Sequence, residues 1–167
     1  MGKSKITYRN PIIEDGSEIY ELIKSCPPLD VNSQYFYHII CHDFKKSCVI
    51  AEINQQVVGF VSGYIKPEDP CCLFVWQVAV SKKARGSNLA TNMLTWLTKQ
   101  PKCYNINSLE ATVSPSNQAS QKLFKRFAKS NNAICRTLPF LNASHFGVND
   151  HEEEILFKIS SLKISTI

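Results

Sequence analysis

The chain has 167 residues, of which 44% are hydrophobic and 20% charged, and its formal net charge is +5. A length and composition of this kind predict one globular domain, residues 1–167, with a core of its own. Like charges form no run of five and no basic stripe alternates with aromatic residues. The composition therefore argues against a nucleic-acid-binding protein.

Cysteine usage and hydropathy indicate the cellular setting. No stretch approaches the roughly 18 apolar residues of a membrane span, and residues 1–9 are too polar for a secretory signal. The seven cysteines include no C-x-x-C pair, which favours reduced thiols over a disulfide framework or a zinc site. We therefore expect a cytoplasmic protein with no membrane partner and no bound metal.

Hydrophobic periodicity and turn residues predict a strand, two helices, three strands, a helix, a strand, a helix and two strands. After the first strand, the expected bounds are a helix at 15–25, a helix from 32 or 33, strands at 47–53, 57–65 and 73–80, a helix at 89–97, a strand at 108–113, a helix from 116 or 117, and strands at 133–138 and 153–159. Asp15 is expected to cap the first helix. Residues 140–150 are polar and predict a loop. Hairpins mixed with helical crossovers imply an α/β fold with a mixed sheet.

The most informative stretch joins a buried strand, residues 75–80, to a helix through a basic turn. The turn contains Lys82, Lys83 and Arg85 among small residues. Such a turn presents N–H groups at a helix N-terminus, where they and the helix dipole favour an anion. The P-loop and dinucleotide glycine patterns are both missing. The turn therefore predicts a diphosphate site of another kind.

This turn resembles the acyl-CoA signature of the GCN5-related N-acetyltransferases (GNAT), [Gln/Arg]-x-x-Gly-x-[Gly/Ala]. Arg85 and Ala90 match it, and Asn88 replaces its glycine; asparagine adopts the left-handed region more readily than most residues. Downstream, Asn117 stands where the family has an asparagine on the pantetheine arm. The resemblance implies a three-layer domain with a splayed central sheet. It implies acetyl-CoA as co-substrate, held by Val78, Ala79, Val80, Arg85, Gly86, Ser87, Asn88, Leu89, Ala90 and Asn117.

Further segments are similar to one subgroup of that family, the L-2,4-diaminobutyrate acetyltransferases of ectoine synthesis. They lie at residues 8–11, 26–30, 73–80, 109–113 and 151–154. The resemblance implies a cytoplasmic homodimer with a part in osmoadaptation. It also implies that the 4-amino group of diaminobutyrate attacks the thioester directly.

The same resemblance suggests roles near the reacting atoms. The N–H of Val78, freed by a bulge in its strand, is expected to stabilise the negative charge that develops on the thioester oxygen. Asp30 and Glu110 are candidates for removing a proton from the substrate ammonium or for binding it, and His151 is a candidate for proton shuttling or for pairing with the substrate carboxylate. The remaining substrate-contact candidates are Trp76 and Glu153.

Structural explanations stay open for several of these residues. Asp30 is also placed to cap the next helix, Trp76 to fill the core, and His151 to lie in a plain loop. Glu110 lies in a strand, where a glutamate more often faces solvent.

The departures from the family pattern leave two alternatives open. Phe124 stands where many members carry a tyrosine that protonates the leaving thiolate, so this acid is water or another residue, such as Tyr35 or Tyr37. One alternative is a GNAT enzyme that acts on another small amine or polyamine, an aminoglycoside or a protein N-terminus. The other, which Asn88 and Phe124 support, is a catalytically degenerate CoA-binding module.

Overall fold

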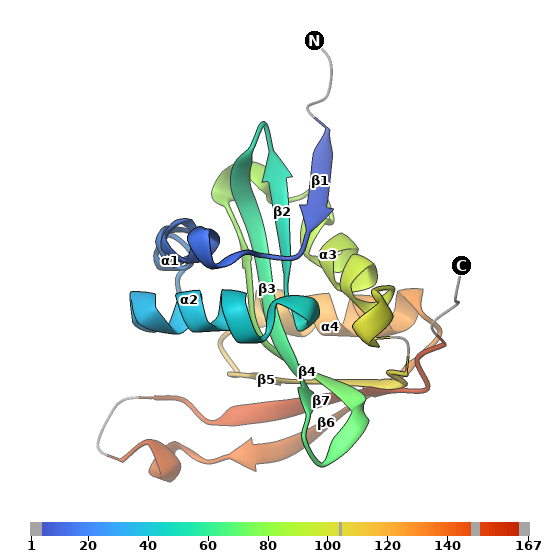
Figure 1. Cartoon of the computed structure of the whole chain (residues 1–167). Coiled ribbons are helices and arrows are strands. Elements are labelled where there is room, and N and C mark those ends of the chain that lie inside the picture. Colours follow the sequence, from blue (N-terminus) through green and yellow to red (C-terminus); the bar gives the residue numbers. More distant parts are fainter. Residues whose placement is uncertain (1–4, 104, 148–150, 164–167) are drawn as a thin grey trace.

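The structure is a computed structural model that describes residues 5–103, 105–147 and 151–163 (Figure 1). Within these ranges, seven strands and four α-helices follow the predicted order, which confirms the mixed α/β fold. They are β1 Ile6–Arg9, α1 Gly16–Lys24, α2 Gln34–Asp43, β2 Val49–Ile53, β3 Gln56–Lys66, β4 Asp69–Val80, α3 Leu89–Thr98, β5 Ser108–Val113, α4 Gln118–Ser130, β6 Ile134–Leu141 and β7 Glu154–Ser160.

The strands form one mixed sheet in the order β1-β2-β3-β4-β5-β7-β6. The pair β4 and β5 is parallel, and the other neighbouring pairs are antiparallel. Pairing between β4 and β5 ends at Val75 and Ala111, although β4 continues to Val80. The two strands therefore diverge beyond this point, which confirms the splayed sheet (Figure 1).

Helices cover the sheet on both faces and create two apolar cores. One core joins α1 and α2 to the sheet, with Ile19, Tyr37 and Phe60 fully buried in it. The other joins α3 and α4 to the opposite face and includes Met93 and Phe127. The sheet between two helical layers is the three-layer arrangement that the sequence predicts.

Two of the predicted helix starts carry the capping hydrogen bond that their residue types favour. Ser33 accepts from the Phe36 N–H at 3.2 Å, and the Asn117 side chain accepts from the Ser120 N–H at 3.1 Å. These bonds fix the N-terminal ends of α2 and α4.

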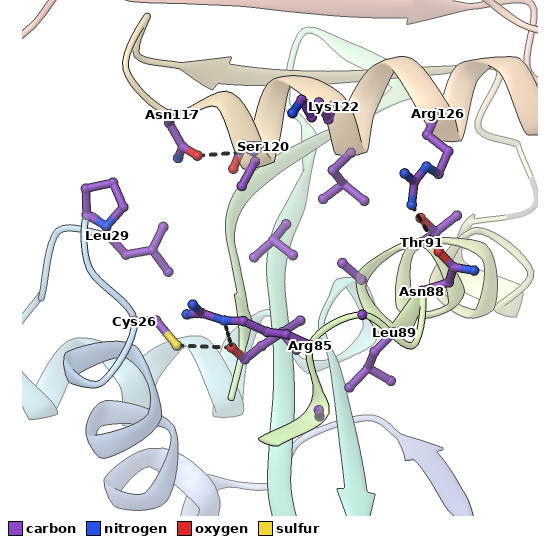
Figure 2. A pocket seen from close by; sticks show the side chains of 18 of the residues that line it. Cys26, Leu29, Arg85, Asn88, Leu89, Thr91, Asn117, Ser120, Lys122 and Arg126 are labelled. Atoms are coloured by element: carbon purple, nitrogen blue, oxygen red, sulfur yellow. Dashed lines mark hydrogen bonds between the residues drawn. The ribbon is translucent and has the colours of Figure 1, made fainter. Parts of the chain in front are cut away.

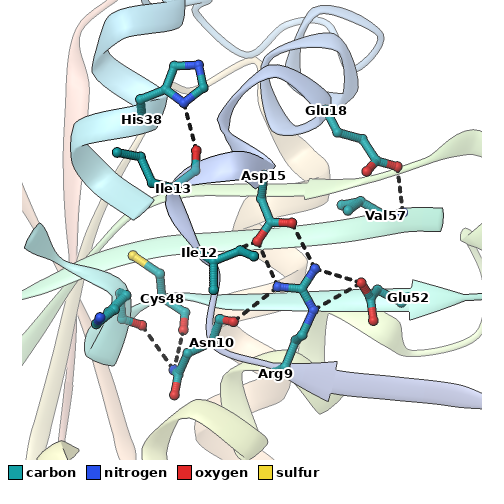
Figure 3. Close-up of polar contacts among 11 residues, drawn as sticks. Arg9, Asn10, Ile12, Ile13, Asp15, Glu18, His38, Cys48, Glu52 and Val57 are labelled. Carbon is teal, nitrogen blue, oxygen red and sulfur yellow. Dashed lines mark hydrogen bonds and ion pairs between the residues drawn. The ribbon is translucent and has the colours of Figure 1, made fainter. Parts of the chain in front are cut away.

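Asp15 departs from its prediction, because its carboxylate makes no capping bond to α1. It pairs instead with Arg9, at 2.7 and 2.8 Å, and accepts from the Ile12 N–H at 2.7 Å (Figure 3). Arg9 also contacts Glu52 of β2 at 2.7 Å. A bidentate arginine bond is stronger than a cap, so Asp15 joins β1, β2 and the start of α1.

The segment predicted as a loop at 140–150 contains more structure than expected. Strand β6 continues to Leu141, and the 3-10 helix η5, Ala143–Phe146, follows. The last three positions of that range lie outside the described residues. No helix among the residues that the structure describes is long and apolar enough to cross a membrane.

Candidate active site

A cavity of about 580 Å³ lies at the point where β4 leaves β5 (Figure 2). Its walls are β4, the turn that leads into α3, the first turns of α4 and the loop after α1. The fold thus brings Asn117 to the same cavity as Arg85, as the sequence predicts. The loop from Cys26 to Leu29 completes the wall.

The turn into α3 contains two residues in the left-handed region of the backbone. Gly86 has a φ of 81° and Asn88 a φ of 57°. Asn88 is the residue before α3, and Leu89 and Ala90 line the cavity just behind it. The first N–H groups of a helix have no partner within the helix. The turn therefore keeps its predicted shape with asparagine in place of glycine, and the helix N-terminus faces the cavity.

Three basic side chains border the cavity, of which only Arg85 was named from the sequence. Lys122 and Arg126 line it from α4, and Arg126 also donates to the Asn88 side chain at 3.0 Å (Figure 2). Both lie on one face of the helix, because residues four positions apart are neighbours there. This spacing is the signal that would have identified them. Together these cations favour a polyanionic ligand.

Two residues that the sequence analysis placed at the co-substrate lie apart from the cavity wall. Ala79 is buried in the core beneath α1 and α2. The Ser87 hydroxyl donates to the Ala84 carbonyl at 2.7 Å and so closes the turn. Neither residue lines the cavity, and a contact of either with the co-substrate stays a prediction.

The expected bulge in β4 is present. Pairing with β3 skips one residue, because Ser62 pairs with Gln77 and Gly63 with Val75. Trp76 is therefore the extra residue of a β-bulge. As a result, Trp76 and Gln77 both contact α2, although neighbouring strand residues ordinarily point to opposite faces.

Beyond the bulge, the backbone of β4 turns its polar groups toward the cavity. The carbonyl of Val80 accepts from Arg85 Nε at 3.2 Å and from the Cys26 thiol at 3.4 Å (Figure 2), so it points away from β3. Backbone groups of alternate residues in a strand point to the same edge. Those of Val78, which also lines the cavity, therefore point into it.

Trp76 lies at the bulge of β4 with 49% of its surface exposed. Its ring packs edge-on against Phe36, with centroids 5.1 Å apart, and against Tyr64 at 6.3 Å. The ring is thus partly packed and partly exposed, and its contact with the substrate stays a prediction.

Asp30 and His151, far apart in the sequence, meet on the α2 side of the sheet. Nε2 of His151 lies 3.3 Å from the Asp30 carboxylate, and its ring stacks on Phe146 with centroids 3.9 Å apart. The hydrogen bond to the Glu152 carbonyl, followed by the Asp30 contact, raises the pKa of His151. Asp30 makes no cap, since Ser33 caps α2. The pair is a carboxylate and a histidine whose pKa is raised above its ordinary value.

Glu154, and not Glu153, belongs to this cluster. Glu153 is exposed, whereas Glu154 at the start of β7 is partly buried and hydrogen-bonded to Thr112. Burial raises the pKa of Glu154 although His151 lowers it. Glu153 precedes β7 and is exposed to solvent, so its contact with the substrate stays a prediction.

Glu110 is placed differently from the expectation of a base or ammonium anchor. Its carboxylate is buried and contacts Lys66 at 2.6 Å and Lys158 at 3.2 Å. Burial acts to raise its pKa, but the two lysines outweigh burial and the pKa of Glu110 is lowered. A carboxylate with a lowered pKa holds a proton weakly, and the lysines occupy both of its oxygens. This geometry makes Glu110 an ion-pairing residue of the sheet.

Other candidates for acid or nucleophilic chemistry are tied into the core. Phe124 packs on Phe157, with ring centroids 6.1 Å apart, and the buried Tyr37 donates its hydroxyl hydrogen to Gln77. Burial raises the pKa of Cys41 and Cys48 to about 12, which opposes thiolate formation. Among residues that the structure describes, no group of three or more histidine, cysteine or acidic side chains could hold a metal ion.

Comparison with known proteins decides the family. A sequence model described as "Acetyltransferase (GNAT) family" matches residues 16–128. The chain belongs to the GNAT acetyltransferases. The co-substrate of this family is acetyl-CoA, and the splayed sheet, the bulged fourth strand and the turn into α3 now have a common explanation as GNAT features.

Curated GNAT relatives cover nearly the whole chain. The L-2,4-diaminobutyric acid acetyltransferase of Halalkalibacterium halodurans is 41% identical over 157 residues, which is 94% of this chain and 82% of that protein. The enzyme of the same name from Methylotuvimicrobium alcaliphilum is 43% identical over 159 residues, 95% of this chain and 92% of that protein.

Solved GNAT structures agree with this fold. Diaminobutyrate acetyltransferase EctA from Paenibacillus lautus, in complex with L-2,4-diaminobutyric acid and coenzyme A, matches with a TM-score of 0.93 at 37% identity, over 99% of this chain and 100% of that chain. Ard1 from Thermoplasma volcanium matches with a TM-score of 0.75 at 15% identity, over 95% of this chain and 99% of that one. The second match concerns the fold alone.

Proposed function

We propose that this protein transfers the acetyl group of acetyl-CoA to the 4-amino group of L-2,4-diaminobutyrate, a step of ectoine synthesis. The observation that carries the proposal is the match to the Paenibacillus lautus enzyme, whose structure holds that amino acid and coenzyme A, at a TM-score of 0.93 over 99% of this chain. The cavity and the Asp30–His151–Glu154 cluster on either side of β4 support it, because they supply a place for each reactant.

The carrier binds in the cavity between β4 and α4. Its diphosphate lies at the N-terminus of α3, where N–H groups and the helix dipole favour an anion, and Arg85, Lys122 and Arg126 add positive charge there. The pantetheine arm follows the free edge of β4 toward Val78. Asn117 borders this arm from the start of α4.

The amine nitrogen attacks the thioester carbon, and the carbonyl oxygen becomes negative. The N–H of Val78 stabilises this oxygen from the edge of β4, as an oxyanion hole does in other acyl transfers. The carbon–sulfur bond then breaks and CoA leaves as a thiolate. The attacking nitrogen gives up its remaining extra proton as the amide forms, and this proton neutralises the thiolate. Because a thiol with an ordinary pKa of about 8.5 is a fair leaving group, this step works without a tyrosine at the position of Phe124.

A base must first remove a proton from the substrate ammonium, since an alkyl ammonium has an ordinary pKa of about 10.4. We assign this role to Glu154, whose raised pKa makes it a better proton acceptor than an ordinary carboxylate. Asp30 and Trp76 bind the ammonium end, through charge and through the aromatic face. His151, in its charged form, is suited to the substrate carboxylate.

Several broader statements belong to the same proposal. We infer that the chain is one N-acetyltransferase domain, that it works in the cytoplasm as a homodimer, and that it serves osmoadaptation. An outer strand with exposed apolar side chains suits a second copy, as discussed below.

Turnover against different amines tests the proposal. CoA release is measured with a thiol reagent for diaminobutyrate, ornithine, lysine and spermidine, and the product is assigned by NMR. We expect the highest kcat/KM for diaminobutyrate, with the acetyl group on the 4-amino nitrogen. A preference for any other amine refutes the proposed substrate, and acetyl-CoA binding without transfer to any amine refutes the activity.

A further inference from the structure

Gln77 is a buried polar side chain that the proposed chemistry does not use. Only 5% of its surface is exposed, and it directly follows the extra residue of the β4 bulge. Its main-chain N–H donates to the Ser62 hydroxyl at 3.2 Å, so the strand holds its backbone firmly. A buried amide is costly unless its side-chain atoms have partners.

The partners of the Gln77 amide lie on the loop between α1 and α2 and on α2 itself. Nε2 donates to the backbone carbonyl of Asp30 at 2.7 Å. Oε1 accepts from the hydroxyl of Tyr37 at 3.4 Å. The same hydroxyl accepts from the Asn32 N–H at 3.2 Å. Gln77 and Tyr37 therefore hold the loop at two points, on either side of Val31.

Apart from the contact of the Asp30 carboxylate with His151 at 3.3 Å, the loop is largely exposed at this place. The Asp30 side chain is 83% exposed, and Val31 is 47% exposed. The earlier part of the loop is attached separately, through the Cys26 thiol at Val80 and the backbone bond from Leu29 to Cys26. The backbone on either side of Val31 is thus held by Gln77 and Tyr37, in addition to the His151 contact of the Asp30 side chain, whereas the wall of the acetyl-CoA cavity does not depend on these anchors.

We propose that Gln77 and Tyr37 are positioning residues that set the place of the Asp30 carboxylate over the β4 bulge, and through it the affinity for the amine substrate. This inference rests on the proposed function. The bulge makes this arrangement possible, because it turns Trp76 and Gln77 to the same side of the sheet. Trp76 can then contact the substrate while Gln77 fixes the loop that carries Asp30.

Amine kinetics test the role directly. Gln77→Met keeps the side-chain volume and removes both hydrogen bonds, and Tyr37→Phe removes a single hydroxyl. We expect Gln77→Met to raise the KM for the amine roughly tenfold, as expected for a lost buried hydrogen bond. The KM for acetyl-CoA is expected to stay within about twofold. Tyr37→Phe is expected to act in the same direction, and equal rises in both KM values would refute positioning.

Ser47→Ala provides the matched control. Its buried hydroxyl bonds to the Gly63 carbonyl at 2.8 Å in the same layer, away from Asp30. We expect this variant to lose stability but to keep its amine KM. If Ser47→Ala, at a similar loss of stability, raises the amine KM as much as Gln77→Met does, the effect is structural and the inference is wrong.

A double-mutant cycle shows whether Gln77 acts through Asp30. Once Asp30→Asn has removed the carboxylate, Gln77→Met should raise the amine KM by less than about threefold, because coupled residues are not additive. Equal effects of Gln77→Met in both backgrounds would overturn the inference.

NMR titration of His151 provides a measurement that does not depend on activity. Its ring faces the Asp30 and Glu154 carboxylates, the Glu152 carbonyl and the Phe146 ring. If Gln77 holds Asp30 in place, both Gln77→Met and Asp30→Asn should lower the pKa of His151. An unchanged pKa in Gln77→Met contradicts the positioning role. If no amine is acetylated, the proposed function fails, while this titration still decides the positioning role.

Discussion

Asn88 is the residue at which this chain departs most visibly from the GNAT signature. Its φ of 57° shows why a glycine is usual there, since most side chains destabilise the left-handed conformation. Asparagine tolerates it, and here its side chain also accepts a hydrogen bond from Arg126 of α4. The substitution therefore keeps the turn and adds a tie between the two helices beside the cavity, which removes this support for a degenerate module.

Substitution of Asn88 tests this account. Asn88→Ala should destabilise the fold by about 1 kcal/mol, because alanine carries the left-handed penalty without the hydrogen bond. It should also raise the KM for acetyl-CoA several-fold. Asn88→Gly is the control, since glycine adopts the same backbone freely and should keep that KM close to the parent value. Equal behaviour of the two variants in denaturant unfolding and kinetics would show that backbone conformation is not the cause.

Individual site residues were predictable to different degrees. Those inside a continuous motif, such as Arg85 and Asn117, line the cavity as expected. Those whose role depends on a distant partner were not predictable: Glu110 meets lysines from two other strands, and Glu154 is distinguished from Glu153 only by the start of β7. The spacing of residues in the sequence predicts contacts within one helix or strand, but it does not predict contacts between different strands of the sheet.

At the scale of elements, the β4 bulge decides what each strand residue does. The sequence predicts the strand itself, because its apolar run is plain. The face of each side chain beyond Val75 follows from the register with β3, which no pattern within the strand reveals. One extra residue moves Gln77 to the α2 side and leaves the polar groups of Val78 and Val80 at the free edge.

Glu110 joins three strands and should make their cohesion depend on pH. Its lysine partners lie on β3 and β7, and its pKa is lowered in the folded protein. A lowered pKa stabilises the fold above the ordinary range of a glutamate, and the contribution is lost as the pH falls through the lowered pKa. Glu110→Gln should therefore cost about 1–2 kcal/mol at pH 7, a value reduced because both lysines are partly exposed.

Urea unfolding of the parent and Glu110→Gln as a function of pH measures this effect. The difference in unfolding free energy should shrink toward acid pH, where the parent also loses the charge. Lys46→Gln, a surface charge in η2 (Lys45–Ser47), serves as a comparison. A difference that stays constant down to the lowest pH at which both proteins fold would exclude an ionic origin.

At the scale of the whole molecule, the order of elements was predictable because each has its own apolar pattern. The sheet order and the break between β4 and β5 were accessible only through the family resemblance, since they depend on packing between distant segments. The core beneath α3 and α4 shows why the break is tolerated, because it contains side chains from strands on both sides of it, such as Val75 of β4 and Ala111 of β5.

The outer strand β6 should carry the interface of the proposed homodimer. It lies at the edge of the sheet, and Ile134, Leu138 and Phe140 are 49%, 46% and 51% exposed. Alternation places Ile134 and Leu138 on one face, and Phe140 lies at a bulge in the pairing with β7. Exposed apolar residues gathered on one strand are typical of a contact surface. Leu138→Asp combined with Phe140→Asp should give a monomer in sedimentation experiments.

Ile12→Asp is the comparison for that experiment, because Ile12 is an equally exposed apolar residue at the opposite end of the sheet, next to β1. This variant should sediment like the parent. A parent protein that is monomeric at micromolar concentration, or a dimer that survives the β6 substitutions, would reject the assignment.

The divergence of β4 and β5 links the stability of the folded protein to the binding of its co-substrate. Where the two strands part, the free edge of β4 faces the cavity in which we propose that acetyl-CoA binds, in place of a neighbouring strand. A ligand that fills such a gap binds only the folded chain and raises its resistance to unfolding by mass action. The free energy of unfolding of this protein should therefore rise and fall with the concentration of acetyl-CoA in the cell.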